Sequence, residues 1–303
     1  MSDQVKLKFS AGVKAALAAN TPIVALESTV IAHGLPRPQN LATAQRLEKI
    51  IRDADATPAT IAILNGEICV GLSGEQIRFI AETDNIKKIS TRDLPIAMAQ
   101  RWNGATTVAT TSWIAHCAGI KVFSTGGIGG VHRGNQLDVS ADLPILATTA
   151  IVVVCSGAKI VLDLPATREW LETHGITVVG YGCDELPAFY SAISGLAVDV
   201  SVNSPAEVSS LYHAQRELGL DRALLVTVPV PAQFAVPEME LKNTLATALQ
   251  EANEQSIAGR ELTPFLLSRM AQTSKGATLK ANIALLENNA RVAALIAREL
   301  SLT

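Results

Sequence analysis

The chain has 303 residues, a net charge of −3 and 48% hydrophobic side chains, of which few are aromatic. This length allows one large domain or two ordinary ones, and the apolar content is sufficient for a sizeable core of Ala, Val, Ile and Leu. The charge and a pI of about 6.0 exclude the basic surface that nucleic-acid binding requires.

The chain also lacks the signals of a membrane or secreted protein. No apolar run approaches the ~20 residues of a transmembrane helix, and the first ten residues lack the apolar stretch of a signal peptide. The four cysteines form no CxxC pair, so we expect reduced, buried thiols and a cytoplasmic protein. The five histidines show no spacing typical of a zinc site.

The first predicted elements are a strand, a helix and a hairpin. An apolar run predicts a strand over residues 22–29, and an amphipathic pattern predicts a helix over 40–55. Residues 59–71 predict a β-hairpin around Asn65 and Gly66, because this dipeptide accepts the positive φ values of a type I′ turn. The predicted helix therefore lies between two stretches of strand.

The rest of the chain continues this alternation. Further strands are predicted at residues 87–91, 120–125, 150–157, 177–182 and 222–230. Helices are predicted at residues 73–83 (with Ser73 as N-cap), 105–119, 167–175 and 205–219, and two long helices are predicted after residue 240. Strands that are apolar on both faces need covering on both sides, and the hairpin makes the sheet mixed. We therefore predict an α/β fold, a three-layer α/β/α sandwich around a mixed β-sheet, formed by a single domain over residues 1–303.

Several polar residues follow the predicted strands directly, where ligands bind in such folds. Glu27 is either a paired structural carboxylate or a functional one. Lys87 and Lys88 share a short strand, so one of them faces inward unless the strand lies at the surface with a salt bridge. Lys159 follows the small segment 156–158. It is either a pocket lysine that can attack a carbonyl group or an exposed residue beginning the next helix.

Residues 124–142 combine glycines, cations and carboxylates. Five glycines with His132 and Arg133 suit a flexible loop that holds a phosphate through backbone N–H groups, and a mobile surface loop has the same composition. Asp138 and Asp142 either hold Mg²⁺ or Mn²⁺ or cap the following helix. The segment is therefore a candidate site for both an anion and a metal.

The start of the predicted helix over 105–119 is a further candidate anion site. Thr106 and Thr107 either lie beside an anion at the free N–H groups of the helix or simply cap it. Together, a carboxylate, lysines, two aspartates and anion-binding loops suit an enzyme that acts on a sugar phosphate and traps a carbonyl group on lysine. No GxGxxG leads into a helix and no GxxxxGK[ST] occurs, so the usual nucleotide-binding motifs are missing.

Ten long motifs occur in order along the chain: VALESTVIAHGLPRPQN, PATIAILNGEICVGL, STRDLP, NGATTVATT, FSTGGIGGVHRG, DVSADL, VVCSGAK, LPAFY, TPFLLSRM and LKANIALLENNA. As a set they are similar to the motifs of the pseudouridine-5′-phosphate glycosidase family. The resemblance implies a lyase that reversibly cleaves the C–C glycosidic bond of pseudouridine 5′-phosphate to uracil and ribose 5-phosphate. It also implies a homotrimer that requires one divalent metal ion per subunit, usually Mn²⁺.

The resemblance implies roles for ten residues of this chain. Lys159, in CSGAK, matches the lysine that forms a covalent adduct with ribose C1′, and Glu27, in ALEST, matches the general acid. Asp138, in LDVSAD, matches the metal ligand. The others match substrate-binding positions: Lys88 and His132 for the phosphate, and Val108, Ser140, Ala141, Asp142 and Asn282.

One segment departs from the family pattern. Family members commonly carry a longer stretch, often with a histidine and an aromatic residue, where this chain has only Asn135–Leu137. The shortening leaves Asp138 in place and bears on the shape of the loop and on metal affinity. If Gly129 or Gly130 takes a positive φ, its replacement by Val is expected to damage the loop and leave the core intact.

Three alternatives remain open. Another Schiff-base lyase or aldolase for a sugar phosphate would share Lys159 but would not act on pseudouridine 5′-phosphate. A C-glycoside enzyme of the same superfamily would keep Lys159 and Glu27 but prefer an altered base or an unphosphorylated substrate. A non-catalytic sugar-phosphate-binding protein would show no turnover and would retain its ligand affinity after Lys159→Ala.

Overall fold

The computed structural model describes residues 5–134, 137–257 and 262–302. Within these residues, eleven strands form one mixed β-sheet. They are β1 (Leu7–Phe9), β2 (Ile23–Leu26), β3 (Thr57–Leu64), β4 (Glu67–Val70), β5 (Lys87–Ile89), β6 (Gly104–Thr106), β7 (Val122–Ser124), β8 (Val152–Cys155), β9 (Thr177–Tyr181), β10 (Val200–Val202) and β11 (Leu224–Thr227). The predicted α/β class with a mixed sheet is confirmed.

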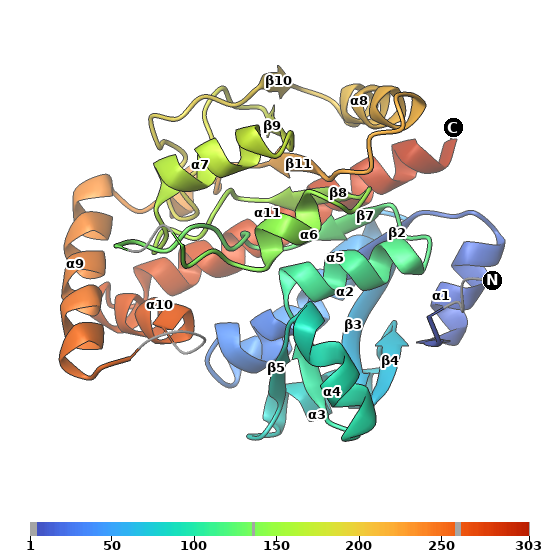
Figure 1. The fold of residues 1–303 in the computed structure, drawn as a ribbon, viewed down its shortest axis with the longest axis horizontal. Helices are drawn as coiled ribbons and strands as arrows, with labels where there is room; N and C mark the ends of the chain where they lie inside the picture. The colour runs from blue at the N-terminus through green and yellow to red at the C-terminus, as the bar shows by residue number, and fades with distance from the viewer. Residues whose placement is uncertain (1–4, 135–136, 258–261, 303) are drawn as a thin grey trace.

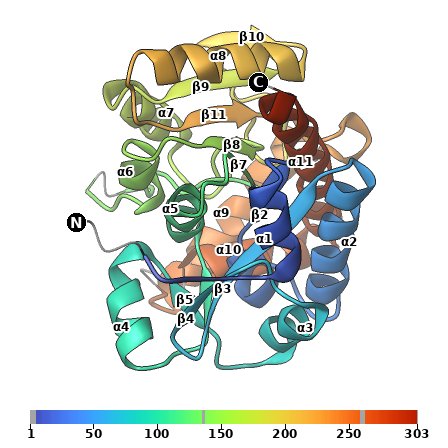
Figure 2. The same cartoon turned by 90° about the vertical axis from the view of Figure 1, so that its right-hand side faces the viewer.

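Helices lie on both sides of the sheet. They are α1 (Ala11–Ala18), α2 (Gln39–Asp53), α3 (Gly74–Glu82), α4 (Leu94–Ala99), α5 (Val108–Cys117), α6 (Asp142–Leu146), α7 (Leu164–Thr173), α8 (Pro205–Glu217), α9 (Glu238–Glu254), α10 (Leu262–Thr273) and α11 (Ala277–Leu302). Figure 1 shows α11 crossing the molecule behind the central strands, with α9 and α10 at one end. Figure 2 shows α5 and α6 on one side of these strands and α2 and α11 on the other.

The strands run in the order β1-β4-β3-β2-β7-β8-β11-β9-β10, and β6 pairs with both β3 and β5. Most neighbouring strands are parallel, whereas β3 is antiparallel to β4 and β6. The predicted hairpin joins β3 to β4, and Asn65 and Gly66 have the expected positive φ values of 50° and 76°. This hairpin is one reason that the sheet is mixed.

The central strands bring distant residues to one edge of the sheet. Leu26 at the end of β2 pairs with Ser124 at the end of β7, which in turn pairs with Val154 in β8. All three strands are fully buried. Helix α11 packs against β2, β7 and β8, and α5 packs against β2 and β7. The residues that follow these strands, among them Glu27 and Thr125, therefore lie next to one another.

The observed helices differ from the predicted ones in two regions of the chain. The helix predicted from residue 105 begins at Val108, because Gly104–Thr106 pairs with β3 and β5 as strand β6. After residue 240 the described residues form three helices, α9, α10 and α11, rather than two. Gly276, with a φ of 86°, separates α10 from α11, since this left-handed backbone conformation ends a helix.

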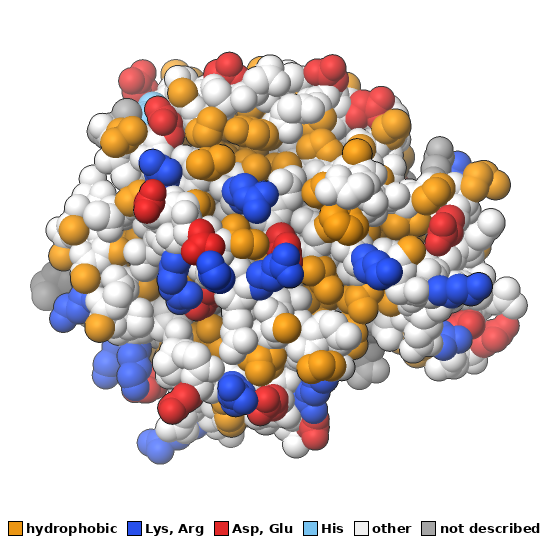
Figure 3. Space-filling view, turned by 180° about the vertical axis from the view of Figure 1, so that it is seen from behind, with side chains coloured by type: hydrophobic (Ala, Val, Ile, Leu, Met, Phe, Trp, Pro, Cys, Tyr) orange, Lys and Arg blue, Asp and Glu red, His pale blue; other side chains and the backbone are white. Residues whose placement is uncertain are grey.

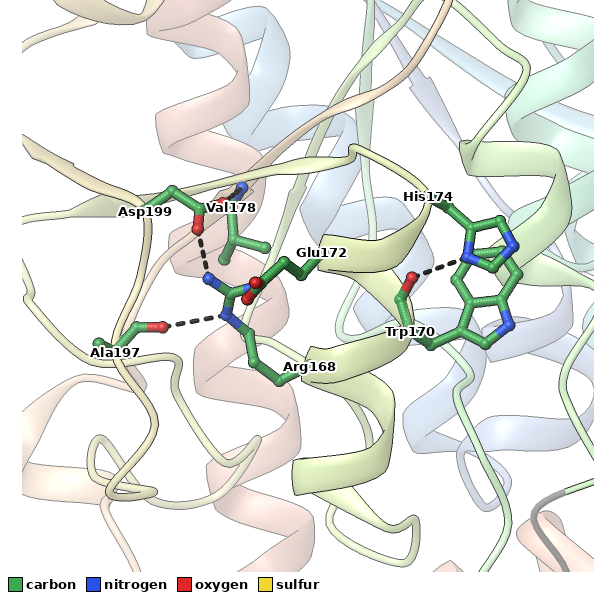
Figure 4. Close-up of polar contacts among 7 residues, drawn as sticks. All are labelled: Arg168, Trp170, Glu172, His174, Val178, Ala197 and Asp199. Atoms are coloured by element: carbon green, nitrogen blue, oxygen red, sulfur yellow. Dashed lines mark hydrogen bonds and ion pairs between the residues drawn. The ribbon is translucent and has the colours of Figure 1, made fainter.

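Helix α7 is tied to the outer strands (Figure 4). The Arg168 guanidinium donates to the carboxylate of Asp199 and, at 3.1 Å, to the carbonyl of Ala197. The other oxygen of Asp199 accepts the N–H of Val178, at 2.8 Å. These contacts join α7 to β9 and to the segment before β10, so the helix that follows Lys159 has a fixed position.

None of the described helices is long and apolar enough to cross a membrane. On the face seen in Figure 3, Lys and Arg side chains are interspersed with Asp and Glu, and apolar side chains gather in its upper part. This face is therefore mixed in charge.

Candidate active site

The described residues enclose a cavity of about 380 Å³ beyond the carboxyl ends of the central strands. All ten residues expected from the sequence line it: Glu27, Lys88, Val108, His132, Asp138, Ser140, Ala141, Asp142, Lys159 and Asn282. They come from seven different elements or loops between β2 and α11. The fold therefore assembles in one place what the sequence distributes over more than 250 positions.

Glu27 follows β2 at the cavity wall and is 8% exposed. Its carboxylate accepts a hydrogen bond from the hydroxyl of Thr125. Burial raises the pKa of Glu27, and the negative charge of Asp142 raises it further. The positive charges of Lys159 and Lys88 and the Thr125 hydrogen bond act in the opposite direction but do not cancel the effect of burial. The group therefore holds its proton to a higher pH than an ordinary glutamate does.

Lys159 lies in the turn between β8 and α7 and is half-buried. Its backbone N–H donates to the carbonyl of Ile128 in the glycine-rich loop, at 3.1 Å. Helix α7 begins only at Leu164, where the Asp163 carboxylate caps it by accepting the N–H of Ala166. The alternative of an exposed lysine at the start of this helix is therefore wrong.

The glycine-rich loop over residues 126–131 is buried throughout, so this part of the segment is not the mobile surface loop considered from composition. Gly129 and Gly130 do not take a positive φ. They are required for space, because a Cβ on Gly129 would lie 2.2 Å from Ser140 Oγ, and one on Gly130 would lie 2.3 Å from Thr167 Oγ1. The positive φ on which the predicted damage by valine depended is therefore absent. Replacement of either glycine is instead expected to damage the loop because the added side chain would clash with its neighbours.

The end of this loop turns back on itself. Val131 and Val139 form an antiparallel bridge, and the N–H of His132 donates to the carbonyl of Asp138, at 2.9 Å. This pairing places His132 and Asp138 side by side at the cavity, with the Asp138 residue exposed. The shortened segment 135–137 connects them, and residues 135 and 136 lie outside the described residues.

Asp142 has a structural use that the sequence did not reveal. It opens α6, is 6% exposed, and its two oxygens accept the N–H groups of Ala109 (2.8 Å) and Gly129 (2.7 Å). Ala109 lies in the first turn of α5. The carboxylate therefore ties the start of α5 to the glycine-rich loop, two of the walls of the cavity.

The structure also decides between the alternatives for the lysines of β5 and for the threonines before α5. Lys87 is exposed, with its ammonium 5.9 Å from the centre of the Trp102 ring, whereas Lys88 is half-buried and lines the cavity. Lys88 is thus the inward-facing lysine of the pair. Thr107 caps α5 by accepting the N–H of Thr110, whereas Thr106 belongs to β6.

Three further residues of the site escaped sequence reasoning. Thr125 contacts Glu27 directly, and Asn289 of α11 donates to the carbonyl of Thr125, at 2.9 Å. His33 lines the cavity from a π-helical turn over Val30–Gly34, and its Nε2 is buried without a hydrogen-bond partner among the described residues. Burial and the nearby charge of Lys88 lower the pKa of His33. All three residues belong to the long motifs of the sequence, which is the only signal that pointed to them.

A divalent metal would depend on few protein ligands here. Among the described residues, no group of three or more His, Cys, Asp or Glu side chains is placed to hold a metal. Asp138 offers an exposed carboxylate at the cavity, whereas both oxygens of Asp142 accept backbone N–H groups. This arrangement fits a hard cation that takes one carboxylate together with water and substrate oxygens, as Mg²⁺ commonly does.

Comparison with known proteins gives consistent results. A family profile described as "Indigoidine synthase A like protein" matches residues 12–299. Pseudouridine-5′-phosphate glycosidases of Petrotoga mobilis and Geobacillus kaustophilus are each 48% identical to the chain, covering 98% and 97% of it, and 97% and 99% of the relative. That of Solibacter usitatus is 46% identical over 97% of the chain and 99% of the relative.

Two solved structures share the fold closely. An indigoidine synthase A-like protein from Thermotoga maritima has a TM-score of 0.91 at 36% identity. The prealnumycin C-glycosynthase AlnA, solved in complex with ribulose 5-phosphate, has a TM-score of 0.90 at 39% identity. Each comparison covers 99% of this chain and 98% of the other.

Proposed function

The chain belongs to the family of indigoidine synthase A-like proteins and pseudouridine-5′-phosphate glycosidases, and on that premise we propose how its cavity works. It is a lyase that reversibly cleaves the C–C glycosidic bond of pseudouridine 5′-phosphate to uracil and ribose 5-phosphate. The observation that carries the residue roles is the meeting of Glu27 and Lys159 in one cavity, close enough for the lysine charge to act on the pKa of the carboxyl group.

The first step opens the ribose ring. A C-glycoside resists cleavage because the base leaves through carbon, which has no lone pair to protonate. The unprotonated amine of Lys159 attacks C1′, so that an N–C1′ bond forms and the C1′–O4′ bond breaks. Glu27, whose pKa is raised by burial, gives its proton to O4′, and the lysine nitrogen releases one proton. General acid catalysis of this kind is typically worth ~10²–10⁴-fold in rate.

The second step breaks the C–C bond. C5 of the uracil ring takes up the proton that the lysine nitrogen released. The nitrogen lone pair of the adduct then forms a C1′=N bond and the C1′–C5 bond breaks, which releases uracil. Water hydrolyses the protonated Schiff base, giving ribose 5-phosphate, free Lys159 and the proton that returns to Glu27. The sum is one substrate and one water converted to the two products, so no redox cofactor is required.

The proposed contacts of the phosphate are Lys88, His132 and the backbone of Val108. All three residues line the cavity, and Val108 is the first residue of α5, where the neighbouring N–H of Ala109 is already bound by the Asp142 carboxylate. Ser140, Ala141, Asp142 and Asn282 complete the wall. Binding of the non-reacting phosphate aligns C1′ with Lys159. Enzymes commonly use the binding energy of a remote part of the substrate in this way to orient the reacting atoms.

Asp138 is the proposed ligand for Mn²⁺. Its exposed carboxylate at the cavity supports this role. When bound, such an ion offsets negative charge and orients oxygen ligands. We expect Asp138→Asn to raise the Mn²⁺ concentration needed for half-maximal activity, without changing the elution volume of the folded protein.

We further propose a homotrimer in the cytoplasm. The apolar side chains gathered on the face in Figure 3 support an interface between copies, since such patches commonly mark one. Four cysteines without a disulfide among them suit a reducing compartment. Light scattering of the purified protein should give a mass of three chains.

The deciding experiment traps the covalent adduct. The protein is incubated with pseudouridine 5′-phosphate and Mn²⁺, borohydride is added, and intact and peptide masses are measured. We expect uracil in solution and a reduced ribose-phosphate adduct on the peptide that contains Lys159, and neither with Lys159→Ala. Folded wild-type protein that releases no uracil and gains no mass would contradict the proposal.

A second candidate is a C-glycoside enzyme with another base, favoured by the similarity to a C-glycosynthase at 39% identity. The same trap with ribose 5-phosphate alone tells the two apart. An adduct on Lys159 from ribose 5-phosphate, with no reaction of pseudouridine 5′-phosphate, would support this second candidate.

A further inference from the structure

Thr125 is a buried residue at the cavity that the scheme above does not use. It follows β7, is 2% exposed, and its hydroxyl donates to Oε1 of Glu27, at 2.5 Å. Its own backbone is held on both sides, because the N–H donates to the carbonyl of Val154 (3.0 Å) and the C=O accepts from Asn289 Nδ2 (2.9 Å). The Thr125 hydroxyl is thus attached to a backbone segment that hydrogen bonds hold in place.

Asn289 joins this segment to a second strand. It is fully buried in α11, and besides Thr125 it contacts Ser156, which follows β8. The Ser156 hydroxyl and the Asn289 amide lie 3.1–3.3 Å apart in two contacts. One side chain of the C-terminal helix therefore fixes the ends of β7 and β8 relative to each other, and these ends lead to Thr125 and to Lys159.

The fixed donor makes the two oxygens of Glu27 unequal. A hydroxyl that donates to Oε1 disfavours a proton on that oxygen, because two O–H groups would then point at each other. A proton carried by Glu27 accordingly resides on Oε2. We propose that Thr125, held by Asn289, is the positioning residue of the general acid: it locks the carboxyl group in one orientation and directs the transferable proton, on Oε2, toward the substrate.

This inference rests on the general-acid role proposed for Glu27. Other charged groups act on the same carboxyl: Lys159 and Lys88 lower its pKa and Asp142 raises it. Loss of the Thr125 hydrogen bond removes one of the influences that lower the pKa of Glu27. A variant without this hydroxyl should therefore keep Glu27 protonated to a higher pH while presenting the proton less well.

The test compares Thr125→Val, which keeps the shape and removes the hydroxyl, with Thr125→Ser, which retains it. Thr227→Val is the matched control, because Thr227 is also fully buried, donates one hydrogen bond to the carbonyl of Val179 (3.0 Å), and is not among the residues that line the cavity. Steady-state kinetics on pseudouridine 5′-phosphate with Mn²⁺ are measured from pH 5 to 10 for each variant and for Glu27→Gln.

We expect Thr125→Val to lower kcat by about 10- to 100-fold with little change in KM, since a misdirected acid loses much of its effect. The fall of kcat at high pH should move to higher pH, Thr125→Ser should restore most of kcat, and Thr227→Val should keep the wild-type profile. A wild-type kcat and pH profile in Thr125→Val, or a Thr125→Ser variant as poor as the valine variant, would overturn the inference. An active Glu27→Gln would instead refute the general-acid role itself.

Discussion

Glu27 shows how the cavity tunes a single carboxyl group. Its carboxyl group is buried, and the positive charges of Lys159 and Lys88 act on it. The free-energy cost of burying the negative charge is larger than the attraction to these lysines, so the pKa of Glu27 is raised. The same burial that prepares the acid therefore destabilises its ionised form.

This conflict leads to a prediction for Glu27→Gln. Above the ordinary pKa of 4.5, the unfolded chain releases a proton that the folded chain retains, so the unfolding free energy of the wild type falls as the pH rises toward the raised folded pKa. Gln is neutral and has no such dependence. We expect the variant to lose activity, and to become more stable relative to the wild type as the pH rises through this window.

Urea denaturation of both proteins at several pH values between 4 and 8 measures the difference. A stability difference that stays constant across this range would show that Glu27 has the same pKa in both states.

At this scale, the sequence identified charged residues better than their supports. Glu27 and Lys159 could be singled out because a charged side chain directly after an apolar strand needs an explanation. Thr125 and Asn289 could not be singled out, because an uncharged hydroxyl or amide at such a position is ordinary and needs no special explanation. Their contacts also join residues 98 and 164 positions apart. Nothing in a local pattern specifies which partner a distant side chain will meet.

At the scale of elements, the glycine-rich loop is held by packing rather than by special backbone angles. Asp142 accepts the N–H of Gly129, and the Thr167 hydroxyl accepts the N–H of Val131. Asp142 leaves no room for a methyl group on Gly129, and Thr167 leaves none for one on Gly130. A loop whose composition suggests flexibility is thus closely packed at both Gly129 and Gly130.

Gly129→Ala tests this constraint. The added Cβ would lie 2.6 Å from Ser140 Cβ and 2.7 Å from Asp142 Oδ2, so the loop or α6 must move. We expect a loss of about 1–3 kcal/mol in the unfolding free energy, as for other overpacked sites, together with a marked drop in kcat/KM.

Gly12→Ala is the control for that substitution. Gly12 lies in α1, and no atom lies within 4 Å of the place that an added methyl group would take, so alanine should be neutral or stabilise the helix by about 0.5–1 kcal/mol. Equal stability of the two variants, by thermal or urea denaturation, would contradict the packing explanation.

Elements with a strong period were predictable, and short ones were not. The helix over Gln39–Asp53 and the hairpin at Asn65 followed from periodicity and turn chemistry. Strand β6, three residues long, was predicted as the start of a helix because its small and hydroxyl residues also suit a helix cap. Tertiary pairing with β3 and β5 decided the outcome, which a local pattern does not contain.

At the scale of the whole molecule, the cavity has a side formed by buried strands and an outer side formed by helices. The strands β7 and β8 are fully buried at the centre of the sheet, whereas α9 stands at the end of the molecule and packs chiefly on α10 (Figure 1). Thr263 and Leu267 of α10 reach the cavity from that outer side.

Hydrogen exchange should therefore be uneven. We expect the amides of β7 and β8 to exchange only through global unfolding, and those of α9 to exchange much faster. Ribose 5-phosphate should slow exchange in α10 because this helix lines the cavity. Equal protection of α9 and β8, measured by mass spectrometry, would refute this division.

The position of Asn289 has a consequence for biosynthesis. Helix α11 follows every other described element along the chain, yet Asn289 holds the residue that contacts Glu27. A ribosome adds residues from the N-terminus, at about 5–20 per second, so Glu27 and Lys159 emerge well before the amide that orders the strand ends around them. Since α11 also covers one face of β2, β7 and β8, catalytic competence arrives only once α11 has been translated and has packed on the sheet.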